Sequence, residues 1–561
     1  MFDSLLRRLA RLSPREDVPD DVLEVTGFLE GDPITLAAAA DGVGVVVCVG
    51  CLLGAAVLGS PSVAILAVFG SIAAVAICRG TLLVVAHGRR TRALGEAPDV
   101  VGRAVLRVRI APTTEGAAAF AAEHDGRLGK SLGGHVRRAR GTPRSGLDSF
   151  AEAWGETFPA LRRSVSLVIA AADAPDGKRE RTLDRAMDAV LDGTRNRAAD
   201  AAESIQGPAT ALYAFGVLLP LALIGVLPAA GAAGIEATLP LVVFVYDLLL
   251  PACVLGVTGW LLANRPVAFP PSPIDRSKHE VPEGWLRPIL AAFVAGTVAS
   301  VLTTPLPRWT TPIAVCGTAA GTGLLVRYRP VIAIRAEAQK VESRLPDGLY
   351  LVGRRVADGV AVETAVEEAA DELDGPAGVA FSEAARRQKQ LRMGIEAALA
   401  GDHGPFATVP SRRTDAVADL LGIAAWQGPP AGEALVETAE HLEALREIEQ
   451  RSRRDLGRVT STLSNTAAGF GPLVGGSTVA LARGVETTDA MGGSAPPTAG
   501  LGIAVGCYVL LLAVVLTVLS VGLARGIDRP TVGYRSGIAL LVATATYLGA
   551  FLVVSQISVG L

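Results

Sequence analysis

The sequence predicts an all-α, polytopic membrane protein with about nine transmembrane helices and two cytoplasmic helical-bundle domains arranged as a tandem repeat. Half of the 561 residues are hydrophobic and the mean hydropathy is +0.41, although aromatic residues make up only 5%. The apolar residues gather in runs of about 20, the length that spans a bilayer. Arg and Lys collect beside alternate ends of these runs, a distribution that sets membrane orientation.

The N-terminal segment 1–33 predicts a short amphipathic helix and not a cleavable signal peptide, because it lacks a continuous apolar core. Apolar side chains recur on one helical face from Phe2 to Leu12, and arginines surround that face. Such a helix lies on the inner membrane surface or packs against the rest of the protein, and both alternatives remain open. We assign 1–33 to the cytoplasmic side.

Nine segments are apolar enough to be candidate spans. They are 34–57, 61–78, 208–230, 237–263, 285–305, 311–327, 464–484, 499–524 and 537–558. We group them as membrane regions 34–86, 208–263, 285–327 and 464–561, with a cytoplasmic linker at 264–284. The turns 59–61 and 231–236 contain no Arg or Lys, whereas the opposite ends are rich in Arg. This asymmetry predicts a cytoplasmic-membrane protein with its N-terminus in the cytoplasm and its C-terminus outside.

Two long hydrophilic segments, 87–207 and 328–463, separate the spans and predict the helical-bundle domains. Both are rich in Ala, Glu, Arg and Leu at helical spacing. Local similarities favour a duplication, with two unrelated helical segments as the alternative. Ala97-Pro98-Asp99 matches Leu345-Pro346-Asp347, and Arg162-Arg163 matches Arg412-Arg413. Each domain is expected to close with a polar helix that runs into a span, the first at Pro208 and the second near Asn465.

The sequence offers no catalytic, cofactor-binding or metal-binding constellation. The six histidines lack metal-ligand spacing, and the six cysteines stand in apolar runs, where we expect small buried fillers. The stretch Gly126–Ser131 resembles part of a phosphate-binding loop, but His124 occupies a position that requires Gly. We therefore expect Gly126 to end a helix and Lys130 to be exposed. A net charge of -3 does not favour nucleic acid as a partner.

Two acidic residues fall inside predicted spans. Asp41 lies in the first span and Asp247 in the middle of the fourth. Asp at the centre of a span costs about 2.5–3.5 kcal/mol, so such residues are usually functional. One interpretation is a coupling site of a secondary transporter that uses Asp247. The other is a protonated or hydrogen-bonded Asp that holds helices together.

The segment Val341–Ala377 resembles the type II secretion system F domain. It has a basic lead-in, a helix start at Leu345-Pro346-Asp347 and a Glu/Ala-rich helix that ends at Gly375-Pro376. Two such domains with paired spans are similar to the membrane platform proteins of archaeal type IV pili, archaella and tight-adherence pili. The resemblance implies a non-enzymatic platform on which a separate hexameric secretion ATPase docks and by which pilin-like subunits are moved into a filament.

From this resemblance we expect the ATPase to contact basic residues of the second domain, namely Arg386, Arg387, Lys389, Arg392, Arg412 and Arg413. Complementary charge would orient the docked partner. The alternative for this face is attraction to anionic membrane lipid, or simple solvation. Gly- and Ala-rich spans also suit packing in a homodimer. A membrane-embedded regulator that binds a soluble partner is a third functional hypothesis, beside the platform and the transporter.

Overall fold

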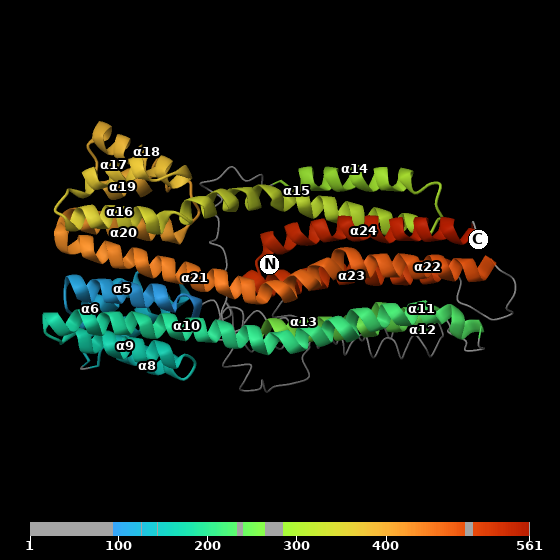
Figure 1. Cartoon of the computed structure of the whole chain (residues 1–561), viewed down its shortest axis with the longest axis horizontal. Helices are drawn as coiled ribbons and strands as arrows, with labels where there is room; N and C mark the ends of the chain where they lie inside the picture. The colour runs from blue at the N-terminus through green and yellow to red at the C-terminus, as the bar shows by residue number, and fades with distance from the viewer. Residues whose placement is uncertain are drawn as a thin grey trace.

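The computed structural model describes residues 94–124, 126–142, 144–232, 239–263, 284–487 and 498–559. The predicted N-terminal segment, the first two spans and nearly all of the linker 264–284 lie outside the described residues. Every regular element in the described part is a helix, which confirms the all-α prediction. The helices follow one long axis, with the bundle domains at one end and the apolar helices at the other (Figure 1).

Among the described residues, four helices are long and apolar enough to cross a membrane, and they indicate a multi-pass membrane protein. They are Gly177–Val226, Leu239–Leu262, Thr498–Arg525 and Arg529–Ile557. They contain or coincide with the predicted spans at 208–230, 237–263, 499–524 and 537–558. The prediction at 285–305 corresponds to the shorter apolar helix α14 (Leu286–Leu302). The prediction at 311–327 falls in α15 (Thr310–Glu342), and most of the prediction at 464–484 falls in α22 (Gly471–Thr487); both helices lie outside this group of four.

The first helical domain packs six helices around an apolar core. They are α5 (Ala97–Ile110), α6 (Thr114–Ala122), α7 (Arg127–Ala139), α8 (Gly146–Gly155), α9 (Pro159–Ala172) and α10 (Asp176–Tyr213). Ser145 caps α8 by accepting a hydrogen bond of 3.1 Å from the backbone N–H of Asp148. Phe150, Leu161 and Leu183 are fully buried in the core.

The second helical domain also contains six helices, which follow directly from α15. They are α16 (Leu345–Ala357), α17 (Val362–Glu372), α18 (Gly375–Leu391), α19 (Ile395–Ala400), α20 (Arg412–Gln427) and α21 (Pro429–Asn465). Ser411 caps α20 through the backbone N–H of Arg413 at 3.2 Å. Leu349, Phe381 and Phe406 are fully buried in its core.

The two domains match in the order of their helices and in the lengths of the helices that enclose them. The opening helices α5 and α16 have 14 and 13 residues, and both carry Pro in the first turn, where a missing N–H costs little. The closing helices α10 and α21 have 38 and 37 residues. In both domains the closing helix packs against the opening helix and the fifth helix.

Glycine permits close packing between two helices of the membrane part. A Cβ on Gly476 of α22 would lie 2.2 Å from the carbonyl oxygen of Tyr547 in α24 (Arg529–Val559). Any Cβ at this position would push the two helices apart, so glycine lets the backbones approach closely. The small-residue composition of segment 464–484 therefore serves packing against α24.

Candidate functional site

The closing helix of each domain changes its hydrogen-bonding pattern where it meets the membrane part. Three short π-helical segments interrupt the described helices, namely η1 (Ala214–Leu218), η2 (Phe244–Leu249) and η3 (Thr466–Phe470). They lead into α11 (Leu219–Ala232), α13 (Leu250–Ala263) and α22, respectively. At the exits predicted at Pro208 and near Asn465 the chain remains helical, since α10 continues through η1 into α11 and α21 continues through η3 into α22.

Proline causes these π-segments. A proline stands two residues after each of them: Pro220, Pro251 and Pro472. A proline ring clashes with the carbonyl four residues earlier and donates no hydrogen bond. The residue before each proline donates instead to the carbonyl five residues earlier, as Leu219 does to Ala214. The wider turn relieves the clash and marks a place where the helix can bend.

Two tyrosines satisfy backbone carbonyls at the first of these breaks. Pro220 leaves the carbonyl of Gly216 without its usual helical donor, and the hydroxyl of Tyr508 donates to that carbonyl at 2.6 Å. Tyr508 belongs to α23 (Thr498–Arg525). The hydroxyl of Tyr246 in η2 donates to the carbonyl of Pro220 at 2.7 Å. The two rings meet edge to face at 5.7 Å, so the break is held against both α23 and η2.

Helix α21 belongs to both domain cores. Ala431, Leu435 and Ala439 are buried in the second domain. Leu445 and Ile448, about three turns further along the helix, are buried among the core residues of the first domain. Helices α10 and α21 also lie side by side (Figure 1). The two domains therefore form one packed unit.

A cluster of charged side chains joins the domains around Arg413. Arg413 pairs with Glu449 of α21 and faces Asp99 of α5 and Glu342 of α15. Burial lowers the pKa of Arg413, but these three carboxylates more than reverse that effect and raise it above its usual value. Burial disfavours a charged carboxylate, so it raises the pKa of Asp99 and of Glu342, and the positive charge of Arg413 opposes this effect. The guanidinium thus holds together acidic groups from three helices.

A second cluster lies further from the spans. Arg109 of α5 donates to Asp184 of α10 at 3.1 Å and also pairs with Glu437 of α21. Burial, and next the charge of Arg109, lower the pKa of His441 to about 4. A neutral imidazole is therefore packed against the guanidinium. Arg195 of α10 and Glu447 of α21 form another ion pair between the two domains at 3.8 Å.

The structure separates the six residues predicted to contact an ATPase. Arg386, Arg387 and Lys389 lie on α18, with Arg392 immediately after its last residue. Arg412 and Arg413 begin α20 on the other side of the domain, facing the first domain. Arg412 reaches Glu96 of the first domain at 3.5 Å. The six residues therefore do not lie on one surface, and their contact with an ATPase stays a prediction.

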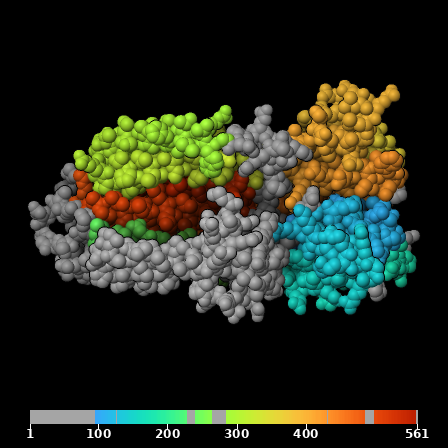
Figure 2. Space-filling model, turned by 180° about the vertical axis from the view of Figure 1, so that it is seen from behind, coloured from blue at the N-terminus to red at the C-terminus, as the bar shows by residue number. Residues whose placement is uncertain are grey.

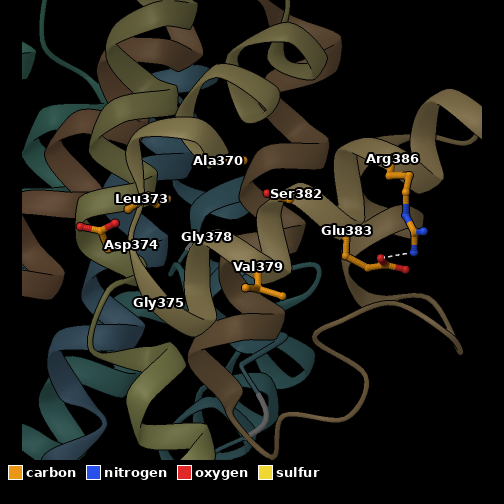
Figure 3. Close-up of a pocket in the computed structure, with 9 residues that line it drawn as sticks. All are labelled: Ala370, Leu373, Asp374, Gly375, Gly378, Val379, Ser382, Glu383 and Arg386. Atoms are coloured by element: carbon orange, nitrogen blue, oxygen red, sulfur yellow. Dashed lines mark hydrogen bonds and ion pairs between the residues drawn. The ribbon is translucent and has the colours of Figure 1, made fainter.

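The basic residues of α18 are themselves paired. Arg386 and Arg387 both donate to Glu383, and Lys389 lies 2.5 Å from Glu367. A shallow cavity of about 390 Å³ lies beside them, with Asp374 and Glu383 at its rim (Figure 3). Its remaining lining is mainly apolar side chains and glycine backbone. This arrangement suits a protein contact better than bond-making chemistry.

Asp247 lies within η2, so it occupies a distorted turn of its span and not a regular one. Its side chain is partly buried. Asp41 lies outside the described residues. The described cysteines, Cys253, Cys316 and Cys507, are free and exposed on the protein surface. The expectation that they would be buried fillers is therefore wrong for these three, since they line the outside of the helices.

Gly126 begins a helix, and the expectation that it would end one is wrong. It is the N-cap of α7, and the backbone N–H of Leu128 donates to a carboxylate oxygen of Glu96 at 3.0 Å. The resemblance to a phosphate-binding loop thus has a physical basis, because a helix N-terminus attracts an anion. Here the anion is the protein's own carboxylate. Lys130 is exposed, as predicted.

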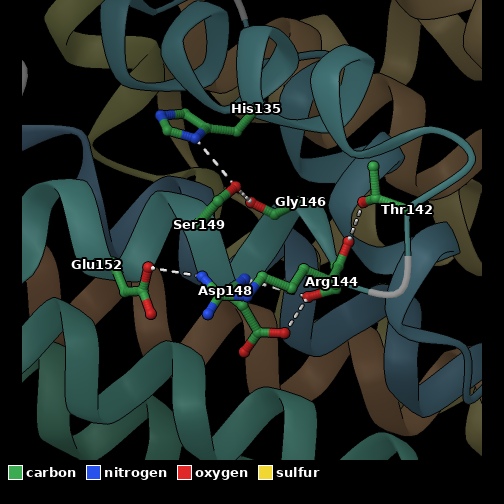
Figure 4. A network of polar contacts seen from close by, with 8 residues as sticks. His135, Thr142, Arg144, Gly146, Asp148, Ser149 and Glu152 are labelled. Carbon is green, nitrogen blue, oxygen red and sulfur yellow. Dashed lines mark hydrogen bonds and ion pairs between the residues drawn. The ribbon is translucent and has the colours of Figure 1, made fainter.

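A Ser–His contact in the first domain serves to shape a turn. The Nδ1 atom of His135 lies 3.0 Å from the hydroxyl of Ser149, which donates to the carbonyl of Gly146 at 3.2 Å (Figure 4). Since the serine proton is already donated to the backbone, His135 is placed to donate to Ser149. Burial, and next the charge of Arg138, lower the pKa of His135.

Comparisons with protein-family models, curated proteins and solved structures found no match. The residues that sequence reasoning missed are the two tyrosines and the contacts of the shared helix α21 with the first domain. The prolines carried a usable signal, because Pro220, Pro251 and Pro472 each interrupt an apolar run.

Proposed function

We propose that this chain is a non-enzymatic platform of the cytoplasmic membrane for assembly of a type IV pilus-like filament or for type II secretion. A separate hexameric secretion ATPase would dock on the helical domains, and its cycle would be passed to the spans, where pilin-like subunits enter the filament. The observation that carries the proposal is the continuity of α10 with α11 and of α21 with α22. A continuous helix transmits a displacement from a domain to a span without a flexible loop.

The finer architecture belongs to the same proposal. We assign nine spans, a cytoplasmic location for the N-terminus and both helical domains, and an external C-terminus. The matched order of helices in the two domains supports an origin by duplication of a type II secretion F-like unit. Lipid surrounds the exposed apolar faces of the spans, and a second copy of the chain is a further partner to test.

Deletion of the gene in its own host tests the function. The platform proposal expects loss of surface filaments in electron micrographs, or loss of the secreted substrate, with recovery when the wild-type gene is returned. A triple variant Arg386→Glu, Lys389→Glu and Arg392→Glu tests the predicted α18 docking face in the same strain. Wild-type filament number and wild-type secretion in the deletion strain would refute the platform.

A secondary transporter is the competing function, favoured by the placement of Asp247 in a π-segment of a span. Asp247→Asn separates the two functions, because a platform with intact packing keeps assembling filaments. A transporter would lose solute uptake into vesicles that contain the purified protein.

A further inference from the structure

The first domain carries an exposed basic surface that the proposed function does not yet use. We define the α7 basic patch as the exposed side chains Lys130, Arg137, Arg138, Arg140 and Arg144. Lys130, Arg137 and Arg138 are seven and eight residues apart, so they share one face of α7. Leu128 and Leu132 are fully buried on the opposite face. The sequence from 126 to 144 contains no Asp or Glu.

Local hydrogen bonds hold the turn that presents this patch. Gly141 adopts a left-handed conformation with φ of 79°, which favours glycine. The hydroxyl of Thr142 donates to the carbonyl of Ala139 at 2.8 Å, and the carbonyl of Arg144 lies 3.2 Å from the same hydroxyl (Figure 4). The N-cap of α8 follows at once. The two arginines of the turn therefore project from an ordered scaffold, which lowers the entropy lost on binding.

The patch is largely free of internal partners. Within the described residues, no ion pair involves Lys130, Arg137, Arg138 or Arg140. Arg144 reaches Glu152 at 3.4 Å, and both side chains are well exposed. The corresponding third helix of the second domain differs, because Glu383 pairs with Arg386 and Arg387, and Glu367 pairs with Lys389. The matched domains thus differ in how many of the basic side chains on the third helix are held by a carboxylate.

Four of the five patch residues lie at the end of α7 that is far from the spans, because the start of α8 at Gly146 lies beside Val136 near the end of α7. The indole N–H of Trp154 donates to Ser131 at 3.2 Å, so the end of α8 lies beside the start of α7. The following helix, α9, begins beside Gly193 of α10. Between Gly193 and Pro208, where the predicted span begins, α10 rises about 22 Å. The basic end of α7 is further still from the membrane, whereas charges are screened within about 8 Å at physiological ionic strength.

We propose that the α7 basic patch is a docking surface for an acidic face of a soluble protein partner. The distance from the spans disfavours anionic lipid as the occupant. Nucleic-acid surfaces combine basic groups with stacking aromatics, and residues 126–144 contain no Phe, Tyr or Trp. The inference rests on the proposed function, since a platform requires a soluble ATPase at its cytoplasmic end. The inference places the electrostatic contact with the soluble partner on the first domain, whereas the sequence prediction placed it on the second.

Binding of an acidic probe to the full-length protein tests the surface directly. The protein is placed in nanodiscs of zwitterionic lipid and titrated with fluorescein-labelled poly-L-glutamate, with anisotropy as the readout at low and high salt. The wild type should bind more weakly as salt rises. The variant Arg137→Glu, Arg138→Glu and Arg140→Glu should bind about tenfold more weakly or worse, because attraction becomes repulsion. Arg→Lys at the same positions should retain binding, since only the charge is needed.

The matched control is Arg386→Glu, Arg387→Glu and Lys389→Glu on α18, which should bind within about twofold of the wild type because each of these three side chains is already held by a carboxylate. Equal loss in both variants, or none in the α7 variant, would overturn the proposal. If a single-stranded oligonucleotide displaced the labelled poly-glutamate at a lower concentration of negative charges than unlabelled poly-glutamate requires, the patch would be assigned to nucleic acid instead. Competition by anionic lipid in the nanodisc would assign it to the membrane.

The same α7 variant, returned to the deletion strain, separates this inference from the proposed function. Weak poly-glutamate binding together with lost filaments supports both the docking surface and the platform function. Weak binding with normal filaments keeps the docking surface but refutes its role in assembly. Normal filaments in the deletion strain itself refute the platform whatever the patch binds.

Discussion

Replacing Arg413 with Ala should loosen the joined domains, and the structure sets the size of the effect. The change leaves Glu449, whose side chain is 13% exposed, beside Asp99 and Glu342 with no central cation. Removing one partner of a buried ion pair costs about 3–5 kcal/mol. Arg413 is 30% exposed, and Asp99 and Glu342 accept protons more readily than ordinary carboxylates. We therefore expect a loss of about 2–3 kcal/mol.

Thermal melting of the full chain in detergent measures this loss. For a folded unit of this size, 1 kcal/mol corresponds to about 2–4 °C, so Arg413→Ala should lower the Tm by about 5–10 °C. The matched control is Arg386→Ala, which removes a side chain that is 61% exposed and pairs within its own helix. Such a pair contributes less than about 1 kcal/mol, and the Tm should fall by less than about 3 °C.

Two further measurements show whether the cluster itself is responsible. Asp99→Asn should restore part of the Tm lost in Arg413→Ala, because it removes one of the unpaired charges. Lower pH should also narrow the gap between Arg413→Ala and the wild type. The pKa of Asp99 and of Glu342 is raised, so both carboxyls protonate as the pH falls and their mutual repulsion disappears. Equal melting of Arg413→Ala and Arg386→Ala would refute this account.

Three other perturbations have defined outcomes. Tyr508→Phe leaves the buried carbonyl of Gly216 without a donor and should cost about 1–2 kcal/mol in chemical denaturation, whereas an unchanged midpoint would contradict the role of this hydroxyl. The pKa of His441 falls from 6.5 to about 4 on folding, so the unfolded chain binds a proton at a higher pH than the folded protein does. The stabilising effect of the neutral imidazole is therefore complete above pH 6.5 and is lost as the pH falls through 4. It amounts to about 3 kcal/mol, so His441→Gln should flatten the wild-type stability profile across that window. Gly476→Leu should force α22 away from Tyr547 and abolish stable purification, whereas Gly476→Ala should yield protein with a lowered Tm.

The parts of the fold that local patterns control were predictable from the sequence. Helical periodicity and apolar runs gave the all-α class and the four helices of the described part that are long and apolar enough to cross a membrane. The similarity of Leu345-Pro346-Asp347 to Ala97-Pro98-Asp99 located the first helix of each domain, because proline is favoured in a first helical turn. The exit of the domains into the membrane was also visible, since polar helical periodicity passes into an apolar run without a break.

The contacts that define the candidate site were not predictable, because they join distant segments. Arg412 and Glu96 are 316 residues apart, and Tyr508 and Gly216 are 292 apart. Charge composition identified Arg412 and Arg413 as a basic pair but could not show which acids face them. An isolated Arg-Arg pair has the same local pattern on a solvated surface and inside a domain interface.

The sharing of α21 changes how force would travel through the proposed platform. If the domains were independent, a partner docked on the first domain would move α10 and α11 alone. Leu445 and Ile448 instead fix α21 in the first core, and the Arg413 cluster ties α20 and α15 to the same place. A displacement applied at the α7 basic patch would therefore reach α22 through α21 as well as α11 through α10. The π-segments then take up the bend, because they lie on both helices at the border of the membrane part.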